Sequence, residues 1–473
     1  MSFPCLRLTP ELPPPDEIVG YLSTLRRPSM ASCLAEAERN DRVLIQPRSG
    51  VASHRKMVEL LDLLSAPRLA DCLTLTIDSH SRLLRFDKAR RLLAESPEEL
   101  NGYPLVAHGY RAVRQLSERY NLPIQVRHGS PDGRRLFAES IAGGVQSFEG
   151  GGISYNLPYC RNVPLEHSLR AWQEIDQACG MLGRMGFPVD REFFGSLSSV
   201  LMPPSIALAV VILEAKLAAR EGCRCLSLAY PQTGNIIQDV ASLATIRVLA
   251  KRYLDDAVDA YPVLHQFMGV FPADVARAEA LIFFGGLTAR IGRATKVISK
   301  TSQEAIGIPD GEVNAAGIRM TRLAFEEYLT YLQLDPSLVQ EEAYWIERET
   351  CELIDPVVSE PDLIAAIVSA FHSGRLDIPF PSNREAKGLV LPVRGADIAI
   401  RFADTGHLPF SKAVKDRNEA QCRRESGGAS VFNWVRDSIM YFAELSNSSV
   451  SKGGRRALDL PRLQVRPARQ GVK

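Results

Sequence analysis

Three arginines stand where they could bind one anion together: Arg48, Arg82 and Arg127 each follow a short apolar run of the sequence. A guanidinium keeps its charge and offers a planar fork of N–H donors that matches a carboxylate or a phosphate. If the apolar runs are strands of one parallel barrel, the three side chains gather at its carboxyl face. They would then form a site for a dicarboxylate or for phosphates; the alternative is structural ion pairing with neighbouring helices.

The stretch SFEGGGISYNLPYC, residues 147–160, adds a carboxylate to this set. Glu149 could neutralise the cationic cluster, hold a substrate ammonium or act as a base. Arginines for carboxylates and a glutamate for an amine describe an amino-dicarboxylic acid such as glutamate or aspartate. The glycines at 150–152 would let the backbone approach a ligand closely. Tyr155 and Tyr159 would share one face if the loop turns helically, although core packing is the alternative for either ring.

Lys300 and Glu304 form a further pair, four residues apart, after the last of the apolar runs. Such a pair is ordinarily a surface ion pair worth a few tenths of a kcal/mol, roughly. A buried lysine at a barrel mouth could instead form a Schiff base, as in lyases of the aldolase type. The sequence contains neither the G-x-G-x-x-G spacing nor a Walker A pattern, and no clustered metal-ligand spacing, so we predict no metal site.

The elements that must position these residues are short apolar, β-branched runs separated mostly by amphipathic helical segments. Strands that alternate with helices predict right-handed βαβ units and a parallel sheet. Eight such runs indicate a closed (β/α)8 TIM barrel, with an open doubly wound sheet as the alternative; polar residues at nearly every strand end favour the barrel, because all its strand ends share one mouth. The expected strands are 43–45, 73–77, 104–107, 124–126, 144–148, 225–229, 263–268 and 296–299.

The 473-residue chain divides, on this interpretation, into an N-terminal helical cap (1–41), a barrel with its following helices (42–354) and a C-terminal α+β elaboration ending in a basic tail (355–473). The net charge of +1 gives no overall field that favours nucleic acid or a membrane surface. Nine dispersed cysteines are typical of reduced thiols, and the N-terminus lacks a signal-peptide pattern. We therefore expect a cytoplasmic protein.

Several long and unusual blocks of the sequence resemble a known family. They include QPRSGV, TIDSHSR, LNGYPLVAHG, QVRHGSPD, SFEGGGISYNLPY, REFFGSLSSVLMPPS, HQFMGVFP and KVISKTSQEAIGIP. In this order they resemble the large catalytic subunit of glutamate mutase, also called methylaspartate mutase, which depends on adenosylcobalamin. The resemblance implies a (β/α)8 barrel that rearranges the carbon skeleton of L-glutamate to 3-methylaspartate by radical chemistry.

The resemblance also implies roles for individual residues. On the substrate side, the carboxylates of glutamate would be held by Arg48, Arg82 and Arg127 with His128 beside them, and the amine end would be surrounded by Glu149, Tyr155 and Tyr159. On the cobalamin or adenosyl side, the matching residues are Gly50, Asn101, Pro158, Phe271, Lys300, Glu304 and Ile308. Lys300 and Glu304 would then hold the adenosyl ribose, and Lys300 would not form a Schiff base.

The chain lacks the cobalamin-binding signature D-x-H-x-x-G: Asp78-Ser79-His80 begins it, but Leu83 stands where the glycine should be. We therefore expect a separate small cobalamin-binding subunit that carries the signature, and a heterotetramer of two large and two small subunits, as the resemblance implies. Ala107 and the turn at 231–233 depart from the family pattern. A lyase that uses Lys300 and a non-catalytic barrel subunit are the competing hypotheses.

Overall fold

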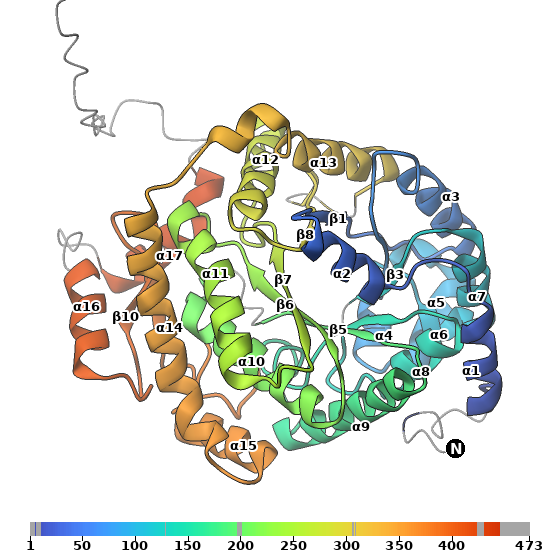
Figure 1. Ribbon diagram of the computed structural model, residues 1–473, viewed down its shortest axis with the longest axis horizontal. Helices are drawn as coiled ribbons and strands as arrows, with labels where there is room; N and C mark the ends of the chain where they lie inside the picture. Colours follow the sequence, from blue (N-terminus) through green and yellow to red (C-terminus); the bar gives the residue numbers. More distant parts are fainter. Residues whose placement is uncertain are drawn as a thin grey trace, which may run out of the picture.

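A computed structural model describes residues 5, 11–127, 129–195, 201–304, 307, 309–422 and 430–444. At its centre, eight parallel strands form one sheet in the order β1-β8-β7-β6-β5-β4-β3-β2 (Figure 1). The strands are β1 (Leu44–Gln46), β2 (Leu73–Thr76), β3 (Ile124–Arg127), β4 (Ser147–Glu149), β5 (Asp190–Phe193), β6 (Cys225–Pro231), β7 (Asp259–His265) and β8 (Lys296–Ile298).

The sheet closes on itself. Strand β1 pairs in parallel with β8, with Ile45 opposite Val297. On its other side β1 meets β2 through backbone hydrogen bonds at both ends: Asp71 N–H donates to Ile45 O at 2.9 Å, and Thr76 N–H donates to Ser49 O at 2.8 Å. These contacts confirm the predicted (β/α)8 barrel over the open doubly wound sheet.

Helices surround the barrel on its outside (Figure 1). In α3 (His54–Leu64) the buried residues Met57, Leu60, Leu61 and Leu64 form one apolar stripe, and the Ser53 hydroxyl accepts a hydrogen bond from the backbone N–H of Lys56 at the helix start. The other outer helices are α5 (Phe86–Glu95), α7 (Tyr110–Arg119), α8 (Arg134–Ala142), α9 (Leu165–Arg184), α10 (Pro204–Arg220), α11 (Ile236–Tyr253), α12 (Val275–Ile291) and α13 (Gly311–Leu323).

One strand predicted from the sequence was wrong, and one strand of the barrel was missed. The run at 104–107 is not a strand: Leu105–His108 form the short helix α6, which with α4 (Ser79–Arg82) and the 3-10 helix η2 (Pro97–Glu99) belongs to the β2–β3 connection. A short apolar run fits a buried helix as well as a strand, and this one is covered by other helices. The strand that the sequence analysis missed is β5, so Arg127 ends the third strand and Glu149 the fourth.

The N-terminal segment holds α1 (Pro15–Thr24) and α2 (Met30–Arg39). Helix α2 lies over the amino ends of the strands (Figure 1), where Met30 and Leu34 pack with Cys72, Cys225 and Tyr261. This contact is the one expected of an N-terminal cap.

After the barrel, α14 (Pro336–Val358) packs along α10 and α11. It leads to α15 (Leu363–Ser373), an antiparallel hairpin of β9 (Leu391–Arg394) and β10 (Ile400–Asp404), and the helices α16 (Lys412–Cys422) and α17 (Val431–Glu444). This segment is the expected α+β elaboration; the exact domain boundaries stay predictions, and the basic tail lies outside the described residues. In the described ranges, no helix is both long and apolar enough to cross a membrane.

Candidate active site

The three arginines meet at one cavity. It has a volume of about 220 Å³ and opens among the carboxyl ends of the strands; its walls are Arg48, Thr76, Ile77, Arg82, Asn101, Arg127, Tyr155, Tyr159, Phe194, His265 and Met268. A second cavity of about 200 Å³ is lined by Arg48, Gly50, Thr76, Asn101, Glu304, Gly307 and Pro309. The two cavities share Arg48, Thr76 and Asn101 and are therefore neighbours.

Arg127, the last residue of β3, is almost completely buried. Its Nη1 donates to Glu192 Oε1 at 2.7 Å and to Gln125 Oε1 at 2.8 Å, while Nη2 lies 3.0 Å from Nε2 of His265. Burial alone lowers the pKa of Arg127, but the nearby carboxylates of Glu192 and Glu149 outweigh that effect and the net shift is upward. The side chain is therefore a fixed cation in the cavity wall.

Glu149, the last residue of β4, lies beside this cation: Glu149 Oε1 is 3.7 Å from Arg127 Nη2. The hydroxyl of Tyr155 donates a hydrogen bond to the same oxygen at 2.5 Å. The chain between them turns helically, with Tyr155 N–H donating to Gly151 O, and the rings of Tyr155 and Tyr159 stack at 5.9 Å. The expected shared face of the two tyrosines is confirmed.

The glycines after Glu149 are required by close packing. Gly150 has φ +140°, and a Cβ on it would lie 2.4 Å from the Trp172 ring. A Cβ on Gly151 would lie 2.2 Å from the carboxylate of Glu214, which accepts hydrogen bonds from the backbone N–H groups of Ile153 and Ser154. The two glycines therefore let the backbone of this loop pack directly against Trp172 and Glu214.

Arg48 belongs to the arginine cluster and also contacts a second charged group, formed by Lys300 and Glu304. Arg48 Nη1 and Lys300 Nζ approach Glu304 Oε2 at 3.3 Å and 2.7 Å. Burial, and then the charge of Arg48, lower the pKa of Lys300 to about 8. Glu304 lines the second cavity together with Gly50. The pair is thus partly buried at the barrel mouth and is not a surface ion pair.

The other predicted cofactor residues are placed differently. Asn101 lines both cavities, and its Oδ1 accepts from the backbone N–H of Ser79. Phe271 is buried against Phe267, and Pro158 is half-buried; neither lines the two cavities. His128 and Ile308 lie outside the described residues.

Sequence reasoning missed three residues at the base of the cavity: Glu192 on β5, His265 at the end of β7 and Lys296 at the start of β8. All three are buried, and Lys296 Nζ lies 2.8 Å from Glu192 Oε2. Burial and the charge of Arg127 lower the pKa of His265 to about 3, so its imidazole is neutral. Glu192 was missed because the charged sequence DREF does not look like a strand, whereas His265 and Lys296 lie in runs that were predicted as strands but whose inward-facing residues were not identified.

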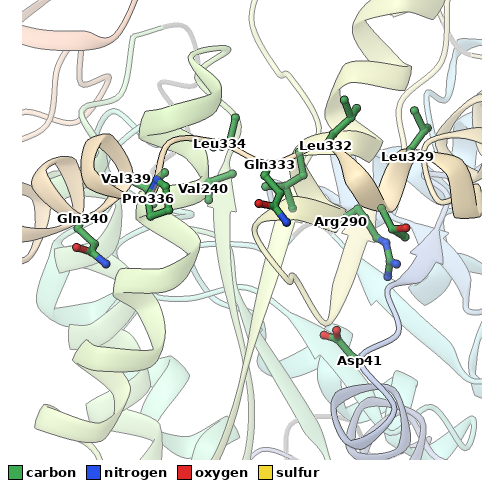
Figure 2. Close-up of a pocket in the computed structure, with 12 residues that line it drawn as sticks. Asp41, Val240, Arg290, Leu329, Leu332, Gln333, Leu334, Pro336, Val339 and Gln340 are labelled. Carbon is green, nitrogen blue, oxygen red and sulfur yellow. The ribbon is translucent and has the colours of Figure 1, made fainter. Parts of the chain in front are cut away.

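A larger cavity, of about 480 Å³, lies elsewhere, between α12, the 3-10 helix η3 (Glu327–Tyr331) and the start of α14. Figure 2 shows mostly aliphatic side chains around it, with the charged groups of Asp41 and Arg290 on one side. It contains none of the predicted site residues. Convergent charged groups, and not volume, therefore identify the barrel mouth as the candidate active site.

The closed barrel, with ionisable side chains from several strand ends around one cavity, defines the class of (β/α)8-barrel enzymes whose site lies at the carboxyl face. Within that class, residues 26–442 match the family model described as methylaspartate mutase E chain (MutE), and the chain belongs to this family. As a member of a mutase family, the chain is an isomerase.

Curated relatives agree with this family. The glutamate mutase epsilon subunit of Haloarcula marismortui is 41% identical over 433 residues, covering 90% of this chain and 88% of that protein. The glutamate mutase epsilon subunit of Halobacterium salinarum is 42% identical over 418 residues, covering 86% and 87%. That of Desulfitobacterium hafniense is 40% identical over 443 residues, covering 90% of each chain.

Proposed function

We propose that this chain is the catalytic subunit of a glutamate mutase, which converts L-glutamate to (2S,3S)-3-methylaspartate with adenosylcobalamin. The observation that carries the proposal is the convergence of Arg48, Arg82 and Arg127 on one small cavity that also contains Tyr155 and adjoins Glu149. Family membership and relatives named glutamate mutase epsilon subunit support the same activity.

The charges of the site match those of glutamate. The arginine forks bind the two carboxylates, and Glu149 accepts the ammonium group, with its orientation fixed by the hydroxyl of Tyr155. A rearranging substrate is briefly in two fragments, one from each end of the molecule. Separate cationic and anionic partners hold both fragments in place, so that they rejoin with the new connectivity.

The second cavity fits part of the proposed cofactor. At Gly50 a Cβ would lie 2.4 Å from Thr76 O, so only glycine leaves this wall in its observed position. The Glu304 carboxylate, held by Lys300 and Arg48, is an acceptor suited to the hydroxyls of a ribose. When bound, adenosylcobalamin supplies a carbon-centred radical that removes hydrogen from the substrate. The shared wall of Arg48, Thr76 and Asn101 would keep cofactor and substrate adjacent.

The same face supports docking of a small subunit that brings cobalamin. Asp78 caps α4 by accepting from the backbone N–H groups of His80 and Ser81, a structural use of the incomplete D-x-H-x-x-G sequence. Large apolar side chains are exposed in loops after the strands, where a covering partner would bury them: Leu83, Leu84, Tyr159 and Val270. The proposed assembly is a heterotetramer of two large and two small subunits in the cytoplasm.

The test is to incubate the purified chain with a small subunit that carries D-x-H-x-x-G, adenosylcobalamin and L-glutamate. We expect 3-methylaspartate, identified by chromatography against the authentic compound. Borohydride treatment during turnover tests the competing lyase: a substrate adduct on Lys300 would replace the mutase proposal. Cofactor and glutamate binding without product would leave a non-catalytic barrel subunit.

A further inference from the structure

A network of buried charges lies beneath the cavity. Its centre is Glu192 on β5, which is fully buried inside the barrel. One carboxylate oxygen, Oε1, accepts from Arg127 Nη1 at 2.7 Å and lies 3.2 Å from His265 Nε2. The other, Oε2, accepts from Gln125 Nε2 at 3.0 Å and lies 2.8 Å from Lys296 Nζ. Oε1 therefore contacts Arg127 and His265, which line the cavity, whereas Oε2 contacts Gln125 and Lys296, which are buried inside the barrel.

This arrangement fixes the orientation of Arg127. The Glu192 bond and the Gln125 bond both use Nη1, while His265 lies at Nη2, so the guanidinium has contacts on two of its nitrogens before any ligand arrives. A guanidinium held in one plane loses less freedom when it forms a bidentate pair with a carboxylate.

Lys296 is a second cation beside Glu192 and gives this buried carboxylate a counterion on the side away from Arg127. Lys296 contacts Glu192 on the opposite oxygen and also lies 4.0 Å from Asp190 Oδ2. Arg127 and Lys296 together balance Glu192 and Asp190 within the barrel, and the Arg127 guanidinium still faces the cavity.

We propose that Glu192 is a positioning residue for substrate binding: from inside the barrel it holds the Arg127 fork in the orientation that receives a substrate carboxylate, and Lys296 is its counterion. This inference rests on the proposed function, since the carboxylate in question is one of the two on glutamate. The neutral imidazole of His265 supports the same guanidinium from the side.

The test compares variants of the complete enzyme with its small subunit and cofactor. In Glu192→Gln we expect the KM for L-glutamate to rise about tenfold or more, with a smaller change in kcat, because an amide cannot hold the fork as a carboxylate does. The double variant Glu192→Gln/Lys296→Met serves if the single variant fails to fold, because it removes one charge of each sign and leaves the buried charges balanced. Its KM for L-glutamate should also rise about tenfold or more.

The matched control is Glu342→Gln. Glu342 is another buried carboxylate between two cations, Arg401 and Arg417, but it lies on α14, away from the cavity. Its loss should lower the melting temperature and leave the KM for glutamate unchanged. A double variant at 192 and 296 with the wild-type KM, or a Glu342→Gln variant with an equally raised KM, would overturn the inference. If the wild-type enzyme forms no 3-methylaspartate, the proposed function fails and this inference fails with it.

Discussion

Replacing Arg127 by lysine keeps the positive charge and removes the fork. In the structure, Arg127 Nη1 binds Glu192 and Gln125 while Nη2 lies near His265 and Glu149. A lysine ammonium is a single point of charge, so it can follow Glu192 or meet the substrate, but it cannot span both. We therefore expect Arg127→Lys to fold and to use glutamate poorly.

The size of the effect follows from the hydrogen bonds that a lysine cannot make. A hydrogen bond to a charged group contributes about 1.5–3 kcal/mol net, so the absence of two such bonds costs about 3–6 kcal/mol. That cost corresponds to a fall in kcat/KM of roughly 10²- to 10⁴-fold.

The assay is steady-state turnover of L-glutamate by the complete enzyme, with circular dichroism to verify folding. Arg119→Lys is the control, because Arg119 is half exposed, lines neither cavity, and among the described residues pairs with Asp62 and contacts the ring of its neighbour Tyr120. Its kcat/KM should equal that of the wild type. A folded Arg127→Lys variant with kcat/KM within about threefold of the wild type would refute the reasoning, since one missing charge-assisted bond already predicts about tenfold or more.

Four further predictions use other parts of the site. Tyr155→Phe removes the 2.5 Å hydrogen bond to Glu149, so kcat/KM should fall about tenfold in the same assay; an unchanged value would remove Tyr155 from this role. Gly151→Ala puts a Cβ 2.2 Å from the Glu214 carboxylate and should lower the melting temperature in calorimetry, whereas Gly183→Ala meets no atom within 4 Å and should not. Because the pKa of Lys300 is lowered to about 8, its ammonium is lost as pH rises through that value, and the KM for adenosylcobalamin should rise over the same range; a flat profile would contradict this. The folded protein then binds fewer protons than the unfolded chain up to about pH 10.5, so the contribution of Lys300 to the free energy of unfolding should increase from pH 8 upward in denaturant titrations.

Most of the barrel could be predicted from the sequence, because its strands and helices follow ordinary patterns. The runs 73–77 and 225–229 are largely apolar, and they correspond closely to β2 and β6. The failure at β5 has a physical cause. Asp190 and Glu192 point into a barrel whose interior is charged, while Arg191 donates to Asp176 and to the Phe148 carbonyl outside it. A strand with three buried charges shows no apolar pattern, since its charges are balanced only by partners distant in the sequence.

The candidate site could be predicted from the sequence only in part. Arg127 and Glu149 are the last residues of their strands, and Arg48 and Arg82 follow β1 and β2 within a few residues. Attention to strand ends was therefore enough to group all four residues. Lys296 and Glu192 could not be found in this way, because they lie within strands and their importance depends on which residues face the barrel interior. That orientation follows from strand register, which the sequence alone did not supply.

The central claim is that this cavity rearranges the carbon skeleton of glutamate, and an isotopic label tests it most directly. In the proposed reaction the fragment that carries C1 and C2 moves from C3 to C4, so C3 becomes a methyl group. L-Glutamate labelled with carbon-13 at C3 should therefore give 3-methylaspartate with the label in its methyl group. The position of the label is followed by nuclear magnetic resonance while the complete enzyme turns over the substrate. A label that stays in a methylene group while cofactor and glutamate are bound, or that appears in any product with the original skeleton, would contradict the account.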